Sequence, residues 1–150
     1  MAEDRVTILI VDDDPGHAEL VRRNLRRAGL QNPMLTIDNG AEALDYVFRR
    51  GVHGEPEARA SSIVFLDINI SGSIDGIEVL RQIKADPRTR RLPVIMLTTA
   101  DDPREVDRCY DLGCNVYVTK PVDPGAFSTA INRLGLILAV ANLPTWGGPG

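Results

Sequence analysis

Polar side chains that could do chemistry follow four of the apolar runs of this sequence, each at or just past the end of the run. They are Asp12 and Asp13 after ILIV, Asp67 after IVFL, Thr98 after VIML and Lys120 two residues past VYV. Because ligands of parallel sheets bind outside the carboxyl ends of the strands, these groups should meet in space. Three carboxylates brought together repel one another unless a cation compensates. The set therefore predicts a divalent metal site.

The donor types favour Mg²⁺, because hard carboxylate oxygens without a nearby His or Cys suit this ion. The backbone carbonyl of Asn69 is a candidate for a further oxygen ligand. A carboxylate beside Mg²⁺ can attack phosphorus and form an aspartyl phosphate, and Asp67 is the candidate nucleophile. Lys120 as a point charge and Thr98 as a hydroxyl donor would then stabilise the phosphoryl oxygens. Taken alone, the acid pair at 12–13 could also be a polar turn with a helix cap.

The elements that must position these groups alternate between strand and helix. Continuous apolar runs are typical of strands that are covered on both faces. Five occur, at 8–11, 34–37, 63–66, 94–97 and 116–118. Helix starts are marked by an acidic cap before proline or by a capping box. They lie at Asp14, Asn39, Asp75, Asp102 and Asp123. Strand and helix alternate five times, which predicts an open, doubly wound α/β sheet.

The composition is that of one globular domain. The chain has 150 residues, 43% hydrophobic and 25% charged, and a net charge of −4, which argues against a nucleic-acid surface. The acidic N-terminus lacks the features of a secretory signal and no apolar run reaches membrane-spanning length, so we expect a cytoplasmic protein. We predict an ordered domain over 1–143 and a flexible tail over 144–150.

The cysteines and histidines carry no predicted role in the chemistry. Cys109 and Cys114 lie five residues apart with no histidine at ligand spacing, which argues against zinc and favours small buried thiols. His17 and His53 are expected to be solvated surface residues. The stretch at 49–61 is expected to be a long surface loop.

Together these motifs resemble the receiver domain of two-component response regulators, from about Val6 to Leu138. The resemblance is carried by the acid pair at 12–13, by LDIN with Asp67, by Thr98 and by Lys120-Pro121. It implies a flavodoxin-like sheet of five strands in the order 2-1-3-4-5 with five helices. It also implies that a sensor histidine kinase phosphorylates Asp67, that Asp13 binds Mg²⁺ directly, and that Asp12 binds it directly or through water.

The resemblance further implies a conformational switch. Tyr117 takes the place of an aromatic residue whose ring turns inward when Thr98 moves toward the phosphoryl group, changing the face built by the fourth helix, fifth strand and fifth helix. By itself Tyr117 is typical of a half-buried strand residue. The Lys120-Pro121 bond is a candidate cis peptide.

One loop departs from the family pattern. The stretch ISGSI at 70–74 is one residue longer than usual and has Ser71 where a proline commonly stands, although Gly76 follows Asp75 as in the family. The loop at 49–61 and the ending RLGLILAVANLP resemble small stand-alone receivers that are paired with bacterial phytochromes.

The last predicted helix favours self-association. Beyond Gly135 it is apolar around most of its circumference, whereas a helix packed on one face of a sheet keeps a polar side. The side chains that a monomer would expose are Leu136, Ile137, Val140 and Leu143. Such patches usually mark an interface, and a two-fold homodimer is the commonest solution. The alternative is a tail that folds back over its own domain.

Three other functions are compatible with parts of the pattern. A phosphatase of the haloacid dehalogenase type would need a second aspartate where Asn69 stands, and would place the paired acids last in the chain. A degenerate receiver that only binds partners is disfavoured because every phosphorylation residue is present. A phosphorelay intermediate or phosphate sink remains open. We therefore predict a phosphoacceptor that catalyses only its own phosphorylation and dephosphorylation.

Overall fold

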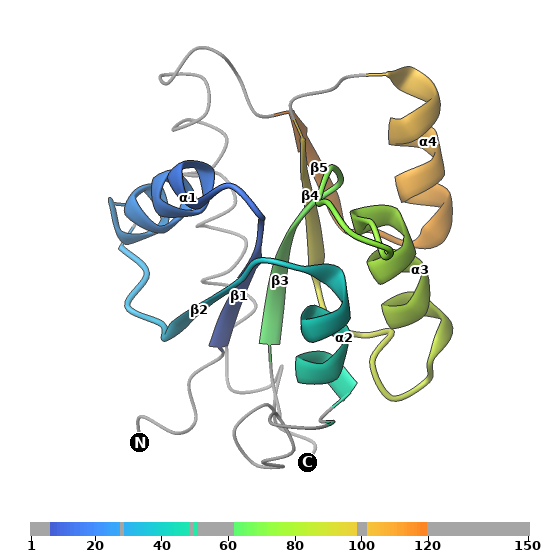
Figure 1. Ribbon diagram of the computed structural model, residues 1–150, viewed down its shortest axis with the longest axis horizontal. Helices are drawn as coiled ribbons and strands as arrows, with labels where there is room; N and C mark the ends of the chain where they lie inside the picture. Colours follow the sequence, from blue (N-terminus) through green and yellow to red (C-terminus); the bar gives the residue numbers. More distant parts are fainter. Residues whose placement is uncertain (1–6, 28, 49, 51–61, 99–101, 120–150) are drawn as a thin grey trace.

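The computed structural model describes residues 7–27, 29–48, 50, 62–98 and 102–119, in which strands and helices alternate (Figure 1). The strands are β1 (Thr7–Val11), β2 (Met34–Ile37), β3 (Ser62–Asp67), β4 (Val94–Thr98) and β5 (Val116–Thr119). The helices are α1 (Pro15–Arg27), α2 (Gly40–Phe48), α3 (Gly76–Ala85) and α4 (Pro103–Leu112). The predicted alternation is confirmed over this part of the chain. The fifth predicted helix, the tail and most of the loop at 49–61 lie outside the described residues.

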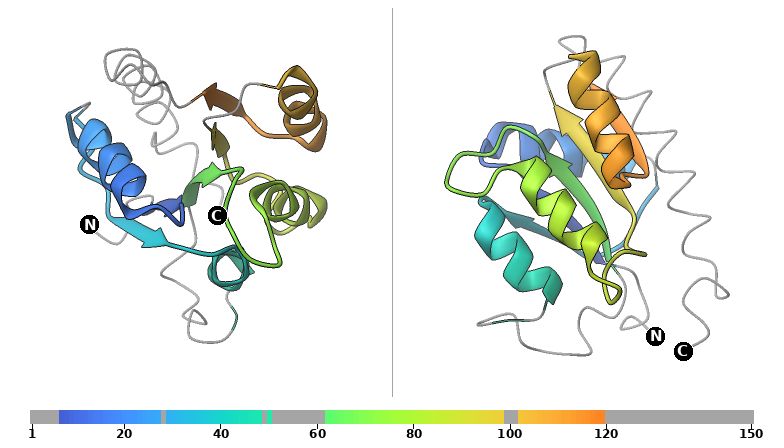
Figure 2. Two further views of the ribbon diagram at one scale, coloured as in Figure 1. Left: turned by 45° about the horizontal axis from the view of Figure 1, so that its top comes forward. Right: turned by 90° about the vertical axis from the view of Figure 1, so that its right-hand side faces the viewer.

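The five strands form one parallel sheet in the order β2-β1-β3-β4-β5, which confirms the predicted order. Helix α1 covers one face of the sheet, and α2, α3 and α4 cover the other (Figure 2). Alternate strand residues enter two separate cores, so that Phe65 packs on the α1 side and Leu66 on the opposite side. Both faces are therefore buried, which explains the continuous apolar runs.

The predicted helix caps are present wherever the chain is described. The Asn39 side chain accepts the N–H of Glu42 at 2.8 Å, and Asp75 accepts the N–H of Glu78 at 2.9 Å. Asp14 and Asp102 accept backbone N–H groups in the same way, at 2.8 and 2.9 Å. These bonds satisfy amides that have no partner within their own helix. They fix where each helix begins.

A polar network joins α3 to the amino ends of β4 and β5. The Lys84 ammonium donates to the carbonyl oxygens of Arg90 and Leu92 at 2.9 and 2.7 Å, and to Oδ1 of Asn115 at 3.2 Å. The same Oδ1 accepts the N–H of Val94 at 2.9 Å. Burial lowers the pKa of Lys84. The Lys84 ammonium and the Asn115 side chain thus provide hydrogen-bond partners for three backbone groups at this end of the sheet.

Both cysteines are free and buried, as predicted. Burial raises the pKa of Cys109, and burial together with the nearby Cys109 raises the pKa of Cys114 to about 12. Neither thiol is therefore a reactive thiolate near neutral pH. Within the described part of the chain, each helix is too short or too polar to cross a membrane.

Candidate functional site

Two aspartates lie side by side at the carboxyl edge of the sheet. Val11 of β1 is paired with Leu66 of β3, so Asp12, just past β1, and Asp67, the last residue of β3, lie at the same level. This is where the strand order reverses, because β2 lies on one side of β1 and β3 on the other. Such switch points form the ligand crevices of open α/β sheets. Asp12 and Asp67 are only 3% and 7% exposed, which is unusual for carboxylates.

Backbone amides hold both carboxylates in place. The N–H of Asp14 donates to Oδ1 of Asp12, and the N–H of Asn69 donates to Oδ1 of Asp67, each at 2.9 Å. Each bond spans two residues and belongs to the turn that leaves the strand. The turns therefore fix the direction of the acids, while the strands fix their position.

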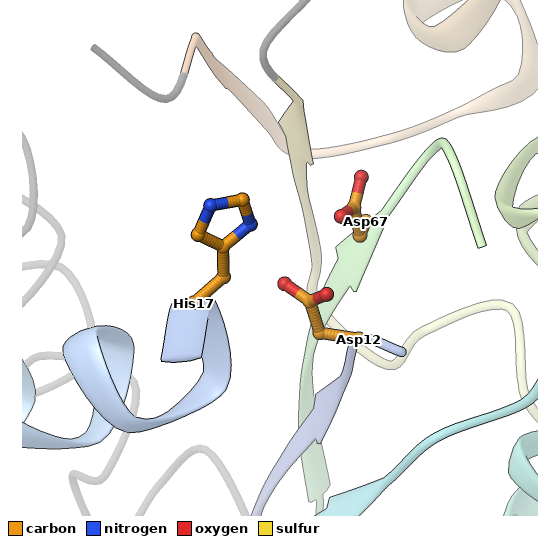
Figure 3. A group of neighbouring side chains, drawn as sticks. All are labelled: Asp12, His17 and Asp67. Atoms are coloured by element: carbon orange, nitrogen blue, oxygen red, sulfur yellow. The ribbon is translucent and has the colours of Figure 1, made fainter. Parts of the chain in front are cut away.

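His17 lies beside the two acids. One of its ring nitrogens and one carboxylate oxygen from each of Asp12 and Asp67 lie within 4.8 Å of one another (Figure 3). We expected a solvated surface histidine, and the structure instead places a half-buried residue beside the acids, with Oδ2 of Asp14 3.6 Å from its Nδ1. The available sequence signal was its position in the first turn of α1, which begins directly after the acid pair.

The carboxylate of Asp13 is bonded to the loop between β3 and α3. Its Oδ2 accepts the backbone N–H of Ser71 at 2.8 Å and the Ser71 hydroxyl at 2.7 Å. Asp13 is half-buried, and Ser71 is exposed. The residue that departs from the family pattern thus contacts a predicted metal ligand. No local sequence signal predicts this bond, because the partners are 58 residues apart.

Close approach of α3 to the end of β3 requires Gly76. A Cβ atom on this residue would lie 2.1 Å from the carbonyl oxygen of Asp67, and the Gly76 N–H donates to the carbonyl of Ile68 at 3.0 Å. A side chain here would push the helix away from the strand end that carries Asp67. The Asp75-Gly76 pair therefore both caps α3 and lets it pack against the site.

Other predicted site residues lie on β4, β5 and beyond. Leu97 pairs with Asp67, so Thr98 follows at the end of the neighbouring strand β4. Tyr117 is half-buried on β5 and packs against the core, as its strand position alone suggested, and its N–H donates to the Tyr110 hydroxyl of α4 at 3.1 Å. Lys120 and the Lys120-Pro121 bond lie outside the described residues, as do Leu136, Ile137, Val140 and Leu143.

The profile of the response regulator receiver domain matches residues 8–132. The chain belongs to this family. A receiver domain from Rhodospirillum rubrum is 44% identical, with a TM-score of 0.77 over 90% of this chain and 94% of that one. The bacteriophytochrome response regulator AtBRR is 37% identical, with a TM-score of 0.70 over 87% and 93%. The receiver is thus similar to regulators of the stand-alone type.

Two further structures show relatives in functional states. The phosphorylated cyanobacterial phytochrome response regulator RcpA is 28% identical, with a TM-score of 0.82 over 93% of this receiver and 99% of that chain. The Mn²⁺-bound form of response regulator Rcp1, from Synechocystis, is 26% identical, with a TM-score of 0.77 over 86% and 91%.

Receiver domains bind a divalent metal at an acidic pocket, and the residues of this receiver fit such an ion. The fit rests on two buried carboxylates whose oxygens lie close enough to share one cation. Carboxylates suit Mg²⁺ or Mn²⁺, while the imidazole of His17 suits softer ions such as Ni²⁺ or Zn²⁺. The pocket can therefore hold a cation beside the predicted phosphoacceptor.

Proposed function

We propose that this receiver domain is a phospho-switch in which Asp67 accepts a phosphoryl group from a sensor histidine kinase in the presence of Mg²⁺. The single observation that carries the proposal is the burial of Asp67 beside Asp12 at the switch point of the sheet. The proposal is supported by the structure of RcpA, a relative with the same fold that was solved in its phosphorylated form.

The transfer would exchange one bond of phosphorus for another. A carboxylate oxygen of Asp67 bonds to phosphorus, while the bond from phosphorus to the kinase histidine breaks. The histidine nitrogen keeps the electron pair and takes up a proton from solvent. The Asn69 N–H, which donates to Oδ1 of Asp67, helps to hold this carboxylate in place. The strand and the turn hold the acid still, so that the phosphoryl group can arrive in line.

The remaining predicted residues stabilise charge. Asp12, Asp13, Asp67 and the backbone carbonyl of Asn69 would hold Mg²⁺, which, when bound, neutralises charge on the phosphoryl oxygens. The Thr98 hydroxyl and the Lys120 ammonium would contact the same oxygens as donors. The receiver would act on no separate substrate, and would be cytoplasmic because the kinase presents its phosphohistidine there.

The signalling step would use the face formed by α4, β5 and the fifth predicted helix. Phosphorylation need only bias two existing arrangements of that face, with Thr98 and Tyr117 passing on the change. The bond from the Tyr117 N–H to the Tyr110 hydroxyl supports this route, because it joins β5 to α4.

The experiment that tests the proposal is intact-mass spectrometry after incubation with Mg²⁺ and acetyl phosphate. We expect one added phosphoryl group on the wild-type chain, and none on Asp67→Asn or in EDTA. Asp111→Asn, which removes an exposed carboxylate of α4, is the matched control and should be labelled normally. Normal labelling of Asp67→Asn would place the acceptor elsewhere.

The partners we propose are a bacteriophytochrome kinase and a second copy of the chain. The likeness to AtBRR, a bacteriophytochrome response regulator, supports the kinase. The predicted apolar patch of Leu136, Ile137, Val140 and Leu143 supports the homodimer. Leu136→Ser should lower the mass measured by sedimentation equilibrium, and a dimer unchanged by both this change and Ile137→Ser would exclude the last helix as the interface.

A further inference from the structure

The loop between β3 and α3 is anchored at both ends and exposed at its tip. Ile70 is 4% exposed, and the Gly76 N–H bonds to the carbonyl of Ile68 at 3.0 Å. Between these anchors Ser71, Gly72 and Ser73 are exposed, and Gly72 has a φ of +110° that favours glycine. The position of the tip therefore depends on the bonds that it makes to other parts of the chain.

Those bonds run to Asp13 in the turn that follows β1. The N–H and the hydroxyl of Ser71 both donate to Oδ2 of Asp13, at 2.8 and 2.7 Å. Hydrogen bonds to an ionised carboxylate are stronger than neutral ones. Because the Ser71 N–H and hydroxyl both reach Oδ2, they fix the orientation of the Asp13 carboxylate.

We propose that Ser71 is a positioning residue for divalent cations: it orients the Asp13 carboxylate, which is a metal ligand in the proposed function, and couples the tip of the β3–α3 loop to metal binding. The inference rests on the metal site of the proposed function. Groups that hydrogen-bond a metal-binding carboxylate orient it and tune its affinity. If the cation binds more tightly when Asp13 is bonded to Ser71, then by linkage the bound cation must also stabilise that bond and the loop conformation that makes it.

The first measurement is the Mg²⁺ dissociation constant by isothermal titration calorimetry, without a phosphodonor. Ser71→Ala removes the hydroxyl and should weaken binding about tenfold, at the lower end of the range for partners of metal ligands, because this pair is exposed to water. Ser71→Thr keeps both donors and should restore the wild-type affinity. Ser73→Ala removes an exposed hydroxyl from the same tip and should change nothing.

The second measurement is hydrogen exchange at the Ser71 amide. The metal-free wild-type protein should protect this amide, Asp13→Ala should abolish the protection, and Mg²⁺ should increase it in the wild type more than in Ser71→Ala. Circular dichroism would show that each variant keeps the fold. This readout reports the bond itself, with or without the cation.

Each outcome decides the proposal. Wild-type affinity in Ser71→Ala, or tighter binding, would overturn the role of Ser71 and leave the proposed phospho-switch standing. Equal weakening by Ser73→Ala would assign the effect to the loop in general and overturn it as well. Absence of Mg²⁺ binding to the wild-type protein would overturn the proposed metal site together with this inference.

Discussion

The two ends of the parallel sheet use polar side chains in opposite ways. At the amino ends of β4 and β5, the half-buried Lys84 ammonium and the exposed Asn115 side chain bind carbonyl and amide groups of the backbone. At the carboxyl ends of β1 and β3, the like-charged side chains of Asp12 and Asp67 lie together out of water. The first arrangement provides hydrogen-bond partners for the backbone, whereas the second is suited to binding a cation.

The polar groups at the amino end serve the stability of the fold, whereas those at the carboxyl end serve ligand binding. A hydrogen-bonded network stabilises the fold whether or not a ligand is bound. Adjacent buried carboxylates repel, so they lower the stability of the metal-free protein and raise its affinity for a cation. Variants at the two ends should therefore respond differently to Mg²⁺, and the following predictions are ordered by the size of the expected effect.

The largest effect is expected at the carboxyl end, from Gly76→Ala. The new Cβ would overlap the carbonyl oxygen of Asp67, so α3 must shift and the free energy of unfolding should fall by about 3 kcal/mol. Urea denaturation measures the loss, and phosphoryl labelling should fall with it. Gly16→Ala is the control, because its Cβ would meet only the side-chain oxygen of Asp14, at 3.2 Å. Equal stability of both variants would contradict the close approach of α3.

At the amino end, Lys84→Met should lower the free energy of unfolding by about 2 kcal/mol, because it leaves two carbonyl groups and the Asn115 oxygen with fewer donors. The loss should be the same with and without Mg²⁺, since the network lies at the far end of the sheet from the pocket. Urea denaturation at both conditions checks this. A loss that Mg²⁺ restores would show that the two ends are coupled.

Asp12→Asn should change the free energy of unfolding in the opposite direction. Removing one of two adjacent negative charges should raise the free energy of unfolding of the metal-free protein by about 1 kcal/mol. Saturating Mg²⁺ should stabilise the wild-type protein more than the variant, so the difference should shrink or reverse. Denaturation in EDTA and in Mg²⁺ gives both values. A destabilised variant in EDTA would mean that the carboxylates do not repel.

The smallest effect is expected from His17→Gln. Imidazole is a good ligand for Ni²⁺ and a poor one for Mg²⁺, so the variant should bind Ni²⁺ several-fold more weakly and Mg²⁺ unchanged. Calorimetric titration with each ion measures the two affinities, and His53→Gln controls for binding by the only other histidine. Equal changes for both ions would indicate that His17 shapes the pocket without binding the metal.

Local patterns of residues specify the elements and the place of the acids. The five strands and the caps at Asn39, Asp75 and Asp102 rest on local patterns, namely continuous apolar runs and acceptors that bind the next turn. Asp67 could be assigned to the carboxyl edge because it ends an apolar run. The strand order came from the likeness of these motifs to a family, since no local pattern specifies which strands are neighbours.

Which side chains meet around those acids depends on contacts between distant parts of the folded chain. Ser71 bonds to Asp13 across 58 residues, and Asn115 meets Lys84 across 31, so no spacing in the sequence connects either pair. His17 lies beside Asp12 and Asp67 because α1, which carries it, begins directly after the turn that follows β1. Such contacts depend on the paths of loops and on the packing of helices, which are settled only when the whole sheet is assembled.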